Sequence, residues 1–245
     1  SGRDLSNANL SGVDLSGKDL TGTVLTGADL SNTILSGIDL SGRDLTGAML
    51  SGVDLSGKDL TGTILTGADL SNSILPDDYL TADDLSGRDF SETILTGIDL
   101  SGKDLTGARM VRVDLSGMDL TGTIFTDANL TGANLSGAIL TNTNLTGINL
   151  SGAKLIDVDL SGMDLTGAMI RGTFMTDVNL VGVNLSGAKL IGVDLSDMDL
   201  TGAIFVGANF ITVNLTNTIL TDANFENVVL DDTILDCIDH PICVN

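Results

Sequence analysis

The residue types that most often carry chemistry gather in one short segment near the end of the sequence. His240 is the only histidine, and the only two cysteines, Cys237 and Cys243, lie within a few residues of it. Two cysteines at this separation form either a disulfide in an oxidising compartment or a pair of free thiols, and the sequence leaves both open. The three residues match no known spacing of zinc ligands, so we predict no metal site.

Other patterns that resemble catalytic sites have a simpler origin in repetition. Serine recurs at regular intervals, and no serine stands out as a nucleophile beside a base. The glycines are equally periodic and no predicted helix follows them, which argues against a phosphate-binding loop. Carboxylate pairs are abundant but are expected on an open surface, whereas small-molecule sites need a concave pocket. We therefore predict that the protein is not an enzyme and has no catalytic residue and no cofactor.

The charge of the sequence indicates which partners it can have. It carries 33 acidic and 11 basic residues, a formal net charge of −22 that is spread along the chain. A field of one sign repels nucleic acid and anionic membranes, so we expect neither as a direct partner. A protein with a basic surface is the expected partner, and loose Ca²⁺ binding is a weaker alternative. We find no transmembrane stretch and no signal peptide, and the localisation stays unknown because the sequence begins at Ser1 without Met.

The elements that position these residues follow from a five-residue repeat. Divided into fives from Ser1, the sequence has 49 pentads, of which 39 end in Leu, and all 30 glycines stand at the second position. A period of five fits neither a helix nor a strand and indicates a chain that turns a corner every five residues. Leu starts the turn, Ser or Thr follows, and Gly stands where a type II turn needs positive φ. The third and fifth side chains then point inward, and the fourth points outward.

The pattern A(D/N)LXX, as in Ala28-Asp29-Leu30 and Ala133-Asn134-Leu135, resembles the pentapeptide-repeat family over essentially the whole chain. The resemblance implies an all-β fold, a right-handed quadrilateral β-helix (a β-solenoid) with four pentads per coil. About 12 coils at ~4.8 Å each would give a rod of roughly 58 Å. We predict one solenoid over residues 1–235 and a cap over residues 236–245 that covers the last coil.

The regular pattern is interrupted at two kinds of position. Residues 76–85, PDDYLTADDL, form an irregular pentad pair, after which the longer repeat resumes five residues late. Either this segment bulges outward, or the coil phase continues unbroken at 20 residues. We favour the unbroken phase, which predicts Lys58–Asp78 and Asp83–Lys103 contacts. Basic residues also occupy six inward third positions, where burial without a partner is costly: Arg3, Lys18, Arg43, Lys58, Arg88 and Lys103.

Apolar residues at some outward fourth positions offer a second possible surface. The period predicts that Val24 and Ile64 share one face and that Ile34 and Ile74 share another. These residues are either scattered surface aliphatics, which are normal on monomers, or a stripe for self-association or a partner.

These observations favour a structural or protein-interaction scaffold of unknown partner. The alternative, implied by the family resemblance, is an acidic DNA mimic that binds DNA gyrase or another topoisomerase. The resemblance lies in the repeat and not in a site, so it assigns a binding role to no individual residue. Ice binding by Ser and Thr ladders is a third and weaker reading, because the ladder positions are mixed and the chain is strongly acidic.

Overall fold

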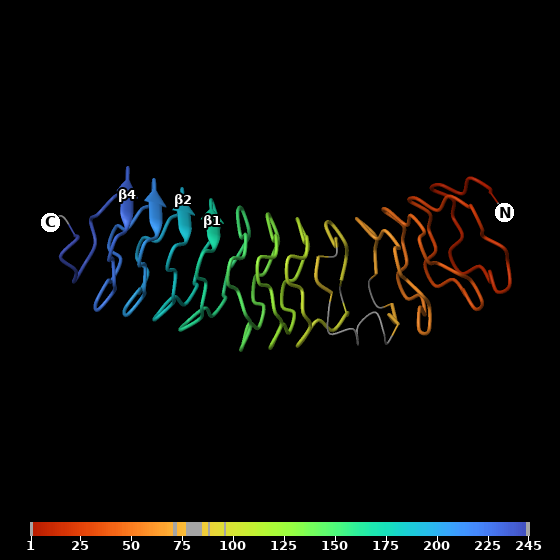
Figure 1. Ribbon diagram of the computed structural model, residues 1–245, viewed down its shortest axis with the longest axis horizontal. Helices are drawn as coiled ribbons and strands as arrows, with labels where there is room; N and C mark the ends of the chain where they lie inside the picture. The colour runs from red at the N-terminus through yellow and green to blue at the C-terminus, as the bar shows by residue number, and fades with distance from the viewer. Residues whose placement is uncertain (1, 71–72, 77–84, 88, 96, 244–245) are drawn as a thin grey trace.

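The protein is a rod of stacked coils with its two termini at opposite ends (Figure 1). The computed structural model describes residues 2–70, 73–76, 85–87, 89–95 and 97–243. Its strands are β1 (Met169–Arg171), β2 (Lys189–Ile191), β3 (Asn209–Ile211) and β4 (Val229–Asp231), which form a parallel sheet in that order. The described residues contain no helix, and isolated parallel bridges join the other coils. The fold is therefore a β-solenoid, whereas its right-handed sense and its total of about 12 coils stay predictions.

The five-residue period produces a tight turn at each corner. At a representative corner the Ala28 amide donates to the Leu25 carbonyl oxygen at 3.0 Å. Gly27, between them, has φ +68°, and all 30 glycines lie between +56° and +81°. Where another residue takes this position it is most often Asn or Asp, the residues that tolerate a left-handed conformation best. The predicted turn with positive φ is confirmed.

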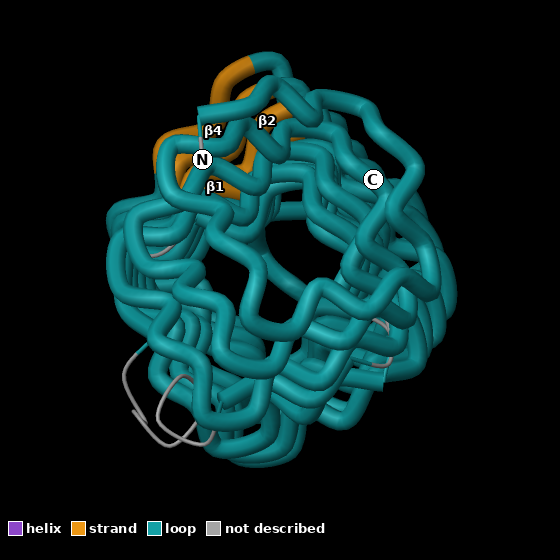
Figure 2. Tube along the Cα trace, turned by 90° about the vertical axis from the view of Figure 1, so that its right-hand side faces the viewer, coloured by secondary structure: helices purple, strands orange, loops and turns teal. Residues whose placement is uncertain are grey.

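Stacking of the coils follows a 20-residue step. Asp29 pairs with Met49, and the Leu30 amide donates to the Met49 carbonyl oxygen at 2.8 Å. Four turns per step give each coil four faces, and the coils superimpose around one axis (Figure 2). We number the faces by their fourth-position residues in the first coil: Asp4 on the first, Asn9 on the second, Asp14 on the third and Asp19 on the fourth.

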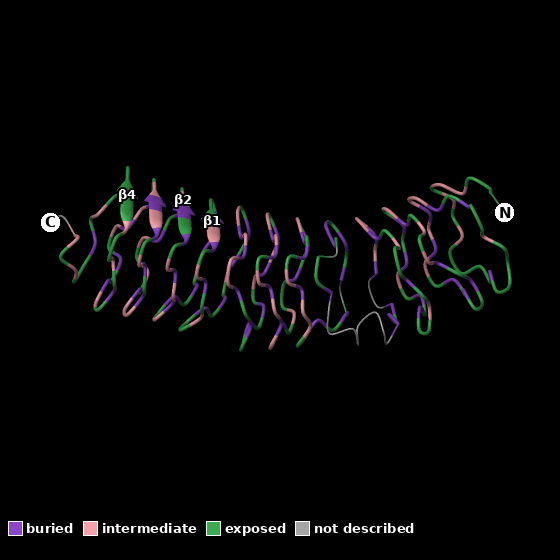
Figure 3. Ribbon diagram, viewed as in Figure 1, coloured by how far each residue is buried: buried purple, intermediate pink, exposed green. Residues whose placement is uncertain are grey.

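Buried residues recur along the rod (Figure 3), and their side chains form one hydrophobic core. Fifth-position residues such as Leu30 and Leu130 are fully buried, and so are small third-position residues such as Ala28. Phe205 and Phe210 enlarge this core near the C-terminal end, where their rings meet edge to face at 5.1 Å between centroids. One large and one small inward residue per side fill the narrow interior, as the sequence predicts.

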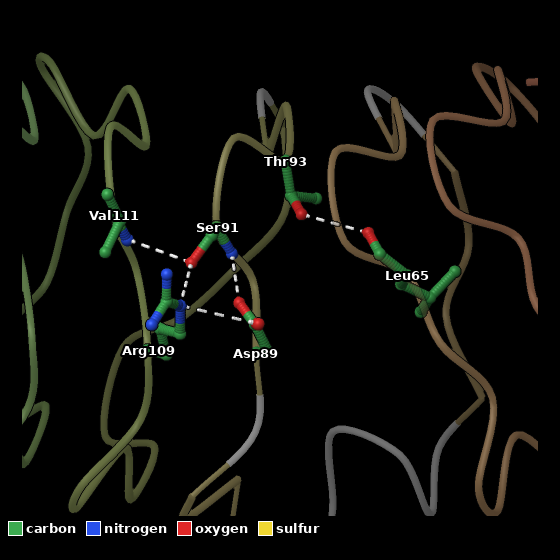
Figure 4. A network of polar contacts seen from close by, with 6 residues as sticks. All are labelled: Leu65, Asp89, Ser91, Thr93, Arg109 and Val111. Carbon is green, nitrogen blue, oxygen red and sulfur yellow. Dashed lines mark hydrogen bonds and ion pairs between the residues drawn. The ribbon is translucent and has the colours of Figure 1, made fainter.

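Across residues 76–85 the coil is five residues longer than elsewhere. Asp54 pairs with Ile74 at the usual step of 20, but Asp69 pairs with Ile94, a step of 25. A side-chain hydrogen bond shows the same longer step, because Thr93 Oγ1 donates to the carbonyl oxygen of Leu65, 28 residues earlier (Figure 4). The Thr123 hydroxyl makes the corresponding bond 23 residues back, to the Leu100 carbonyl oxygen.

The predicted unbroken phase is therefore wrong: the 20-residue step resumes only after five additional residues, as the alternative expects. The outward bulge of that alternative falls on residues 77–84, which lie outside the described residues. An unbroken phase would have placed Asp78 and Asp83 in inward columns, where carboxylates are costly to bury. The longer step instead stacks Thr93 on Ala68, and both are buried. Asp78 and Asp83 lie outside the described residues, and with them the predicted contacts to Lys58 and Lys103.

Polar side chains join the first coils that follow this step (Figure 4). Ser91 Oγ accepts hydrogen bonds from the Val111 amide at 3.3 Å and from Arg109 Nε at 3.2 Å. The same Nε lies 3.6 Å from Asp89 Oδ2. These contacts reinforce the backbone ladder where the regular repeat resumes.

The inward cations of the N-terminal half have different environments. Lys58 Nζ donates to the carbonyl oxygens of Leu35, at 2.5 Å, and Ile38, at 3.1 Å. Arg43 Nε is buried and has no hydrogen-bond partner among the described residues. Arg3 and Lys18 lie exposed in the first coil, and Arg88 is outside the described residues. Lys58 thus shows how an inward ammonium group is accommodated, by backbone carbonyls rather than by a carboxylate.

The C-terminal segment closes with a disulfide between Cys237 and Cys243, whose Cα atoms are 5.1 Å apart. This resolves the choice between a disulfide and two thiols that the sequence leaves open. The Ile238 amide donates to the Thr218 carbonyl oxygen at 2.9 Å, which joins the segment to the coil below. The His240 ring packs on Phe225 with 5.0 Å between ring centroids.

Candidate protein-interaction surface

One face of the solenoid presents a composition that the other three do not share. The outward fourth-position residues of the third face, which we call the Asp–Ile stripe, are aspartate or isoleucine with a single asparagine, and each one is exposed. Ile34 and Ile74 belong to the stripe and are 51% and 59% exposed, so the prediction that they share a face is confirmed. The stripe consists of Asp14, Ile34, Asp54, Ile74, Asp99, Asp119, Ile139, Asp159, Asn179, Asp199 and Ile219.

The aspartates of the stripe stabilise the turns that follow them. Asp99 Oδ1 accepts hydrogen bonds from the amide of Ser101 at 2.9 Å and from its hydroxyl at 2.6 Å. An asparagine can take over this role, since Asn134 Oδ1 on the second face accepts the corresponding bonds from Ser136 at 3.2 and 2.7 Å. Asparagine can therefore replace aspartate at this position and keep the acceptor for the turn without the negative charge.

The same hydrogen bonds keep the stripe ionised. The Ser101 hydroxyl and amide lower the pKa of Asp99, and the hydroxyl and amide of Thr201 lower the pKa of Asp199. A carboxylate that accepts hydrogen bonds is stabilised in its charged form. The pKa is lowered by the following Ser or Thr in all six aspartates of the stripe: Asp14, Asp54, Asp99, Asp119, Asp159 and Asp199.

Isoleucine separates many of these charges. Ile34 lies between Asp14 and Asp54, so these carboxylates are two coils apart, about 9.6 Å, instead of one coil apart. Where the separation is missing, like charges meet: the neighbouring Asp99 raises the pKa of Asp119, although the Thr121 hydroxyl and amide lower it more. The alternation presents charge and apolar surface together with reduced repulsion between stacked carboxylates.

Four surface depressions lie along or beside the stripe. Ile34 and Asp54 line one of about 620 Å³, Asp99 and Asp119 one of about 570 Å³, and Ile139 one of about 430 Å³. The fourth, of about 540 Å³, spans the corner between the second and third faces. No histidine or cysteine lines any of the four. The arrangement suits non-covalent binding of an elongated partner that carries basic and apolar groups.

The remaining chemically capable residues are not assembled into a site. His240 Nδ1 accepts a hydrogen bond from the Ile242 amide at 3.2 Å, beside the disulfide. Among the described residues, no three His, Cys, Asp or Glu side chains gather where they could hold a metal ion. The described part of the chain also has no helix that is long and apolar enough to cross a membrane. The absence of enzymatic activity and of a cofactor stays a prediction.

The repeat itself identifies the family. The family model for pentapeptide repeats matches eight copies, over residues 4–42, 44–76, 84–122, 108–147, 143–180, 179–217 and 210–239. The chain belongs to the pentapeptide-repeat family. The resemblance inferred from the sequence is thereby confirmed. No curated protein shows a significant match.

Several solved structures of pentapeptide-repeat proteins are similar to this chain. HetL, involved in heterocyst differentiation regulation in Nostoc sp. strain PCC 7120, is 27% identical over 100% of this chain and 92% of its own, with a TM-score of 0.31. QnrB1, a plasmid-mediated fluoroquinolone resistance protein, is 20% identical over 85% of each chain, with a TM-score of 0.35. A thylakoid-lumen protein of Arabidopsis thaliana is 31% identical over 41% of this chain and 63% of its own, with a TM-score of 0.19. We transfer no function from these likenesses.

Proposed function

We propose that this protein is a non-enzymatic scaffold that binds a partner protein through the Asp–Ile stripe. The observation that carries the proposal is the composition of the third face, where exposed, ionised aspartates are interspersed with exposed isoleucines. Carboxylates attract a basic surface and steer its approach, and the isoleucines supply apolar area that becomes buried on contact. The partner therefore combines lysine or arginine with apolar side chains.

The shape of the rod supports the same proposal. Its side chains fill the interior, so binding takes place on the outer faces rather than in a central cavity. The proposal treats residues 1–235 as one right-handed solenoid of about 12 coils and residues 236–245 as its cap. It also includes self-association as a second use of exposed aliphatic residues such as Val24 and Ile64, which are 44% and 49% exposed on the first face.

The proposed interface can be tested with two matched triple variants. Asp54→Asn/Asp99→Asn/Asp119→Asn neutralises three charges on the stripe, and Asp19→Asn/Asp39→Asn/Asp59→Asn neutralises three on the fourth face. Each asparagine keeps the side-chain acceptor for the following turn, so we expect both variants to fold. Affinity capture by the stripe variant should lose partners that the wild type and the control variant retain. Equal loss by both variants would show that net charge, rather than this face, governs binding.

A second candidate function is mimicry of DNA toward a topoisomerase. The fourth face favours it, because Asp19, Asp39 and Asp59 stand on successive coils without an apolar residue between them. A net charge of −22 over roughly 58 Å is about one charge per 2.6 Å, against about one per 1.7 Å in duplex DNA.

The two candidates differ in which face they require. We would titrate the wild type and both triple variants into a DNA gyrase supercoiling assay at two salt concentrations. Salt-sensitive inhibition that the fourth-face variant loses would support DNA mimicry. Absence of inhibition at both salt concentrations would remove this candidate and leave the scaffold.

A further inference from the structure

The depression at the corner between the second and third faces contains an exposed aromatic side chain, and we call it the Phe174 cleft. It has a volume of about 540 Å³ and is lined by Phe174, Asp177, Asp194, Asp197 and Asp199, among others. Phe174 is 59% exposed, whereas Phe90, Phe125, Phe205 and Phe210 are buried and Phe225 is partly buried. A phenylalanine held in water beside a concavity is typical of a binding surface, since the core already accommodates this side chain elsewhere.

The carboxylates around Phe174 keep unused acceptor capacity. Asp194 Oδ1 accepts hydrogen bonds from the Ser196 amide at 3.1 Å and from Asn214 Nδ2 at 2.9 Å, and Asp197 Oδ1 accepts one from Asn217 Nδ2 at 3.1 Å. In each case the second oxygen, Oδ2, accepts no hydrogen bond from the described part of the chain.

Asp177 and Asp199 complete the acidic rim of the cleft. Asp177 accepts no hydrogen bond among the described residues, and Asp199 uses its Oδ1 for Thr201. Two cations lie close to Phe174 in the fold: Lys154, its bridge partner one coil earlier on the second face, and Arg171, three residues before it on the same coil. No cation lines the cleft itself. Within the described part of the chain, no ion pair or cation–π contact joins either cation to the Phe174 ring or to the carboxylates around it.

We propose that the Phe174 cleft receives an arginine side chain of the partner protein. This inference rests on the proposed scaffold function and names the chemistry of one anchor point on it. A guanidinium group can stack flat on the phenylalanine ring while its N–H groups donate sideways to the surrounding carboxylates. An ammonium group satisfies the carboxylates but gains less from the ring, so the cleft should prefer arginine to lysine.

The test uses a fluorescein-labelled pentapeptide with two arginines, and its lysine counterpart, with binding followed by fluorescence anisotropy. The wild type should bind the arginine peptide more tightly than the lysine peptide, both at about 0.02 M salt and at about 0.15 M salt. Phe174→Ile should weaken arginine binding about threefold and leave lysine binding unchanged. Isoleucine already occupies this column at Ile94 and Ile234, so the variant should keep the fold. Phe174→Asn, which imitates Asn134 and Asn214 of the same column, provides a second variant.

A charge variant and its control complete the design. Asp177→Asn/Asp197→Asn should weaken the binding of both peptides about fivefold. Asn142 and Asn217 already adopt the required positive φ of 56° and 57°, which makes asparagine compatible with these turns. Asp19→Asn/Asp39→Asn removes the same charge from the distant fourth face and should change neither affinity. An arginine-to-lysine preference that survives Phe174→Ile, or an equal loss in the control, would overturn the proposal.

These outcomes separate the cleft from the scaffold function as a whole. The triple variants of the capture experiment leave every residue that lines the cleft unchanged. Partner capture that depends on the stripe, together with no arginine preference at Phe174, would reject the cleft and retain the scaffold. If partner capture does not depend on the stripe and the cleft shows no arginine preference, the scaffold function is rejected as well.

Discussion

The N-terminal and C-terminal halves of the rod build the same coil from different side chains. In the N-terminal half the fourth position is commonly aspartate and the third position includes Arg43 and Lys58, whereas later coils use more asparagine outside and alanine, valine or threonine inside. Lys58 Nζ donates to the carbonyl oxygen of the residue 23 positions earlier, and the hydroxyls of Thr123 and Thr143 in the same inward column make the same bond. The difference teaches that, where the coil has a donor at this inward point or an acceptor at the outward turn position, that group can be charged or neutral.

The largest effect on stability is expected from the difference in burial between the C-terminal half and the first coil. Leu130 is fully buried in the C-terminal half, whereas Leu10 in the first coil is only partly buried. We expect Leu130→Asp to lower the free energy of unfolding by about 3 kcal/mol or more, because a carboxylate without a partner replaces a core side chain. Leu10→Asp should cost clearly less. Urea unfolding measures both, and equal losses would contradict a core that is weaker at the first coil.

The shared bond of Lys58 and the threonines can be tested directly. Lys58→Thr should retain the bond to the Leu35 carbonyl oxygen without a half-buried charge, so stability should stay equal or rise. Lys58→Ala should lower the free energy of unfolding by about 1–2 kcal/mol, because it leaves the Leu35 and Ile38 carbonyl oxygens without this donor. Thermal unfolding of the two variants would show whether the donor or the charge matters. A loss of stability in Lys58→Thr as large as in Lys58→Ala would show that the ammonium charge itself is required.

Acidification should affect both halves through the turn aspartates. The Ser and Thr groups that follow them lower the pKa of Asp39 and Asp54 in one half and of Asp199 in the other. A lowered pKa in the folded state gives stability that is present above the unfolded value of about 3.9. That stability is lost as the pH falls through the folded pKa. The N-terminal half, which has more of these aspartates, should lose amide hydrogen-exchange protection first below about pH 4. Earlier loss in the C-terminal half would contradict this order.

The smallest expected effect concerns repulsion on the fourth face. Asp39 stands between Asp19 and Asp59. The hydroxyl and amide of Thr61 lower the pKa of Asp59, and the negative charge of Asp39 raises that pKa by a smaller amount. Asp39→Asn keeps the acceptor for the turn and removes one like charge, so it should raise Tm slightly at low salt. The gain should disappear at high salt because screening already removes the repulsion. A fall in Tm would mean that the carboxylate makes a bond to Ser41 that the amide cannot replace.

Much of the fold is readable from local pattern. The position of Gly27 predicts a turn with positive φ, and the period places Ile34 and Ile74 on one face, because both results depend only on residues close in sequence and on a constant step. The step itself changes between Asp69 and Ile94, where the local pattern is lost. The candidate surface was only partly predictable: the shared face of the isoleucines follows from the period, but its depressions depend on how side chains of successive coils pack.

The sequence by itself determined the corner at every fifth residue and the acidic, aliphatic exterior, since a strict five-residue period allows each pentad only one inward and one outward set of side chains. The four-sided solenoid was what its resemblance to the pentapeptide-repeat family implied. The tertiary structure alone decided that the coil step lengthens to 25 residues instead of continuing at 20, where Lys58 finds its carbonyl oxygens, and that Cys237 pairs with Cys243. It also decided that carboxylates from the same coil and the next one border a cleft beside Phe174, whose outward direction already follows from its fourth position in the pentad. Each of these depends on contacts between residues about 20 positions apart or on the folding of a segment outside the repeat, which a five-residue pattern does not encode.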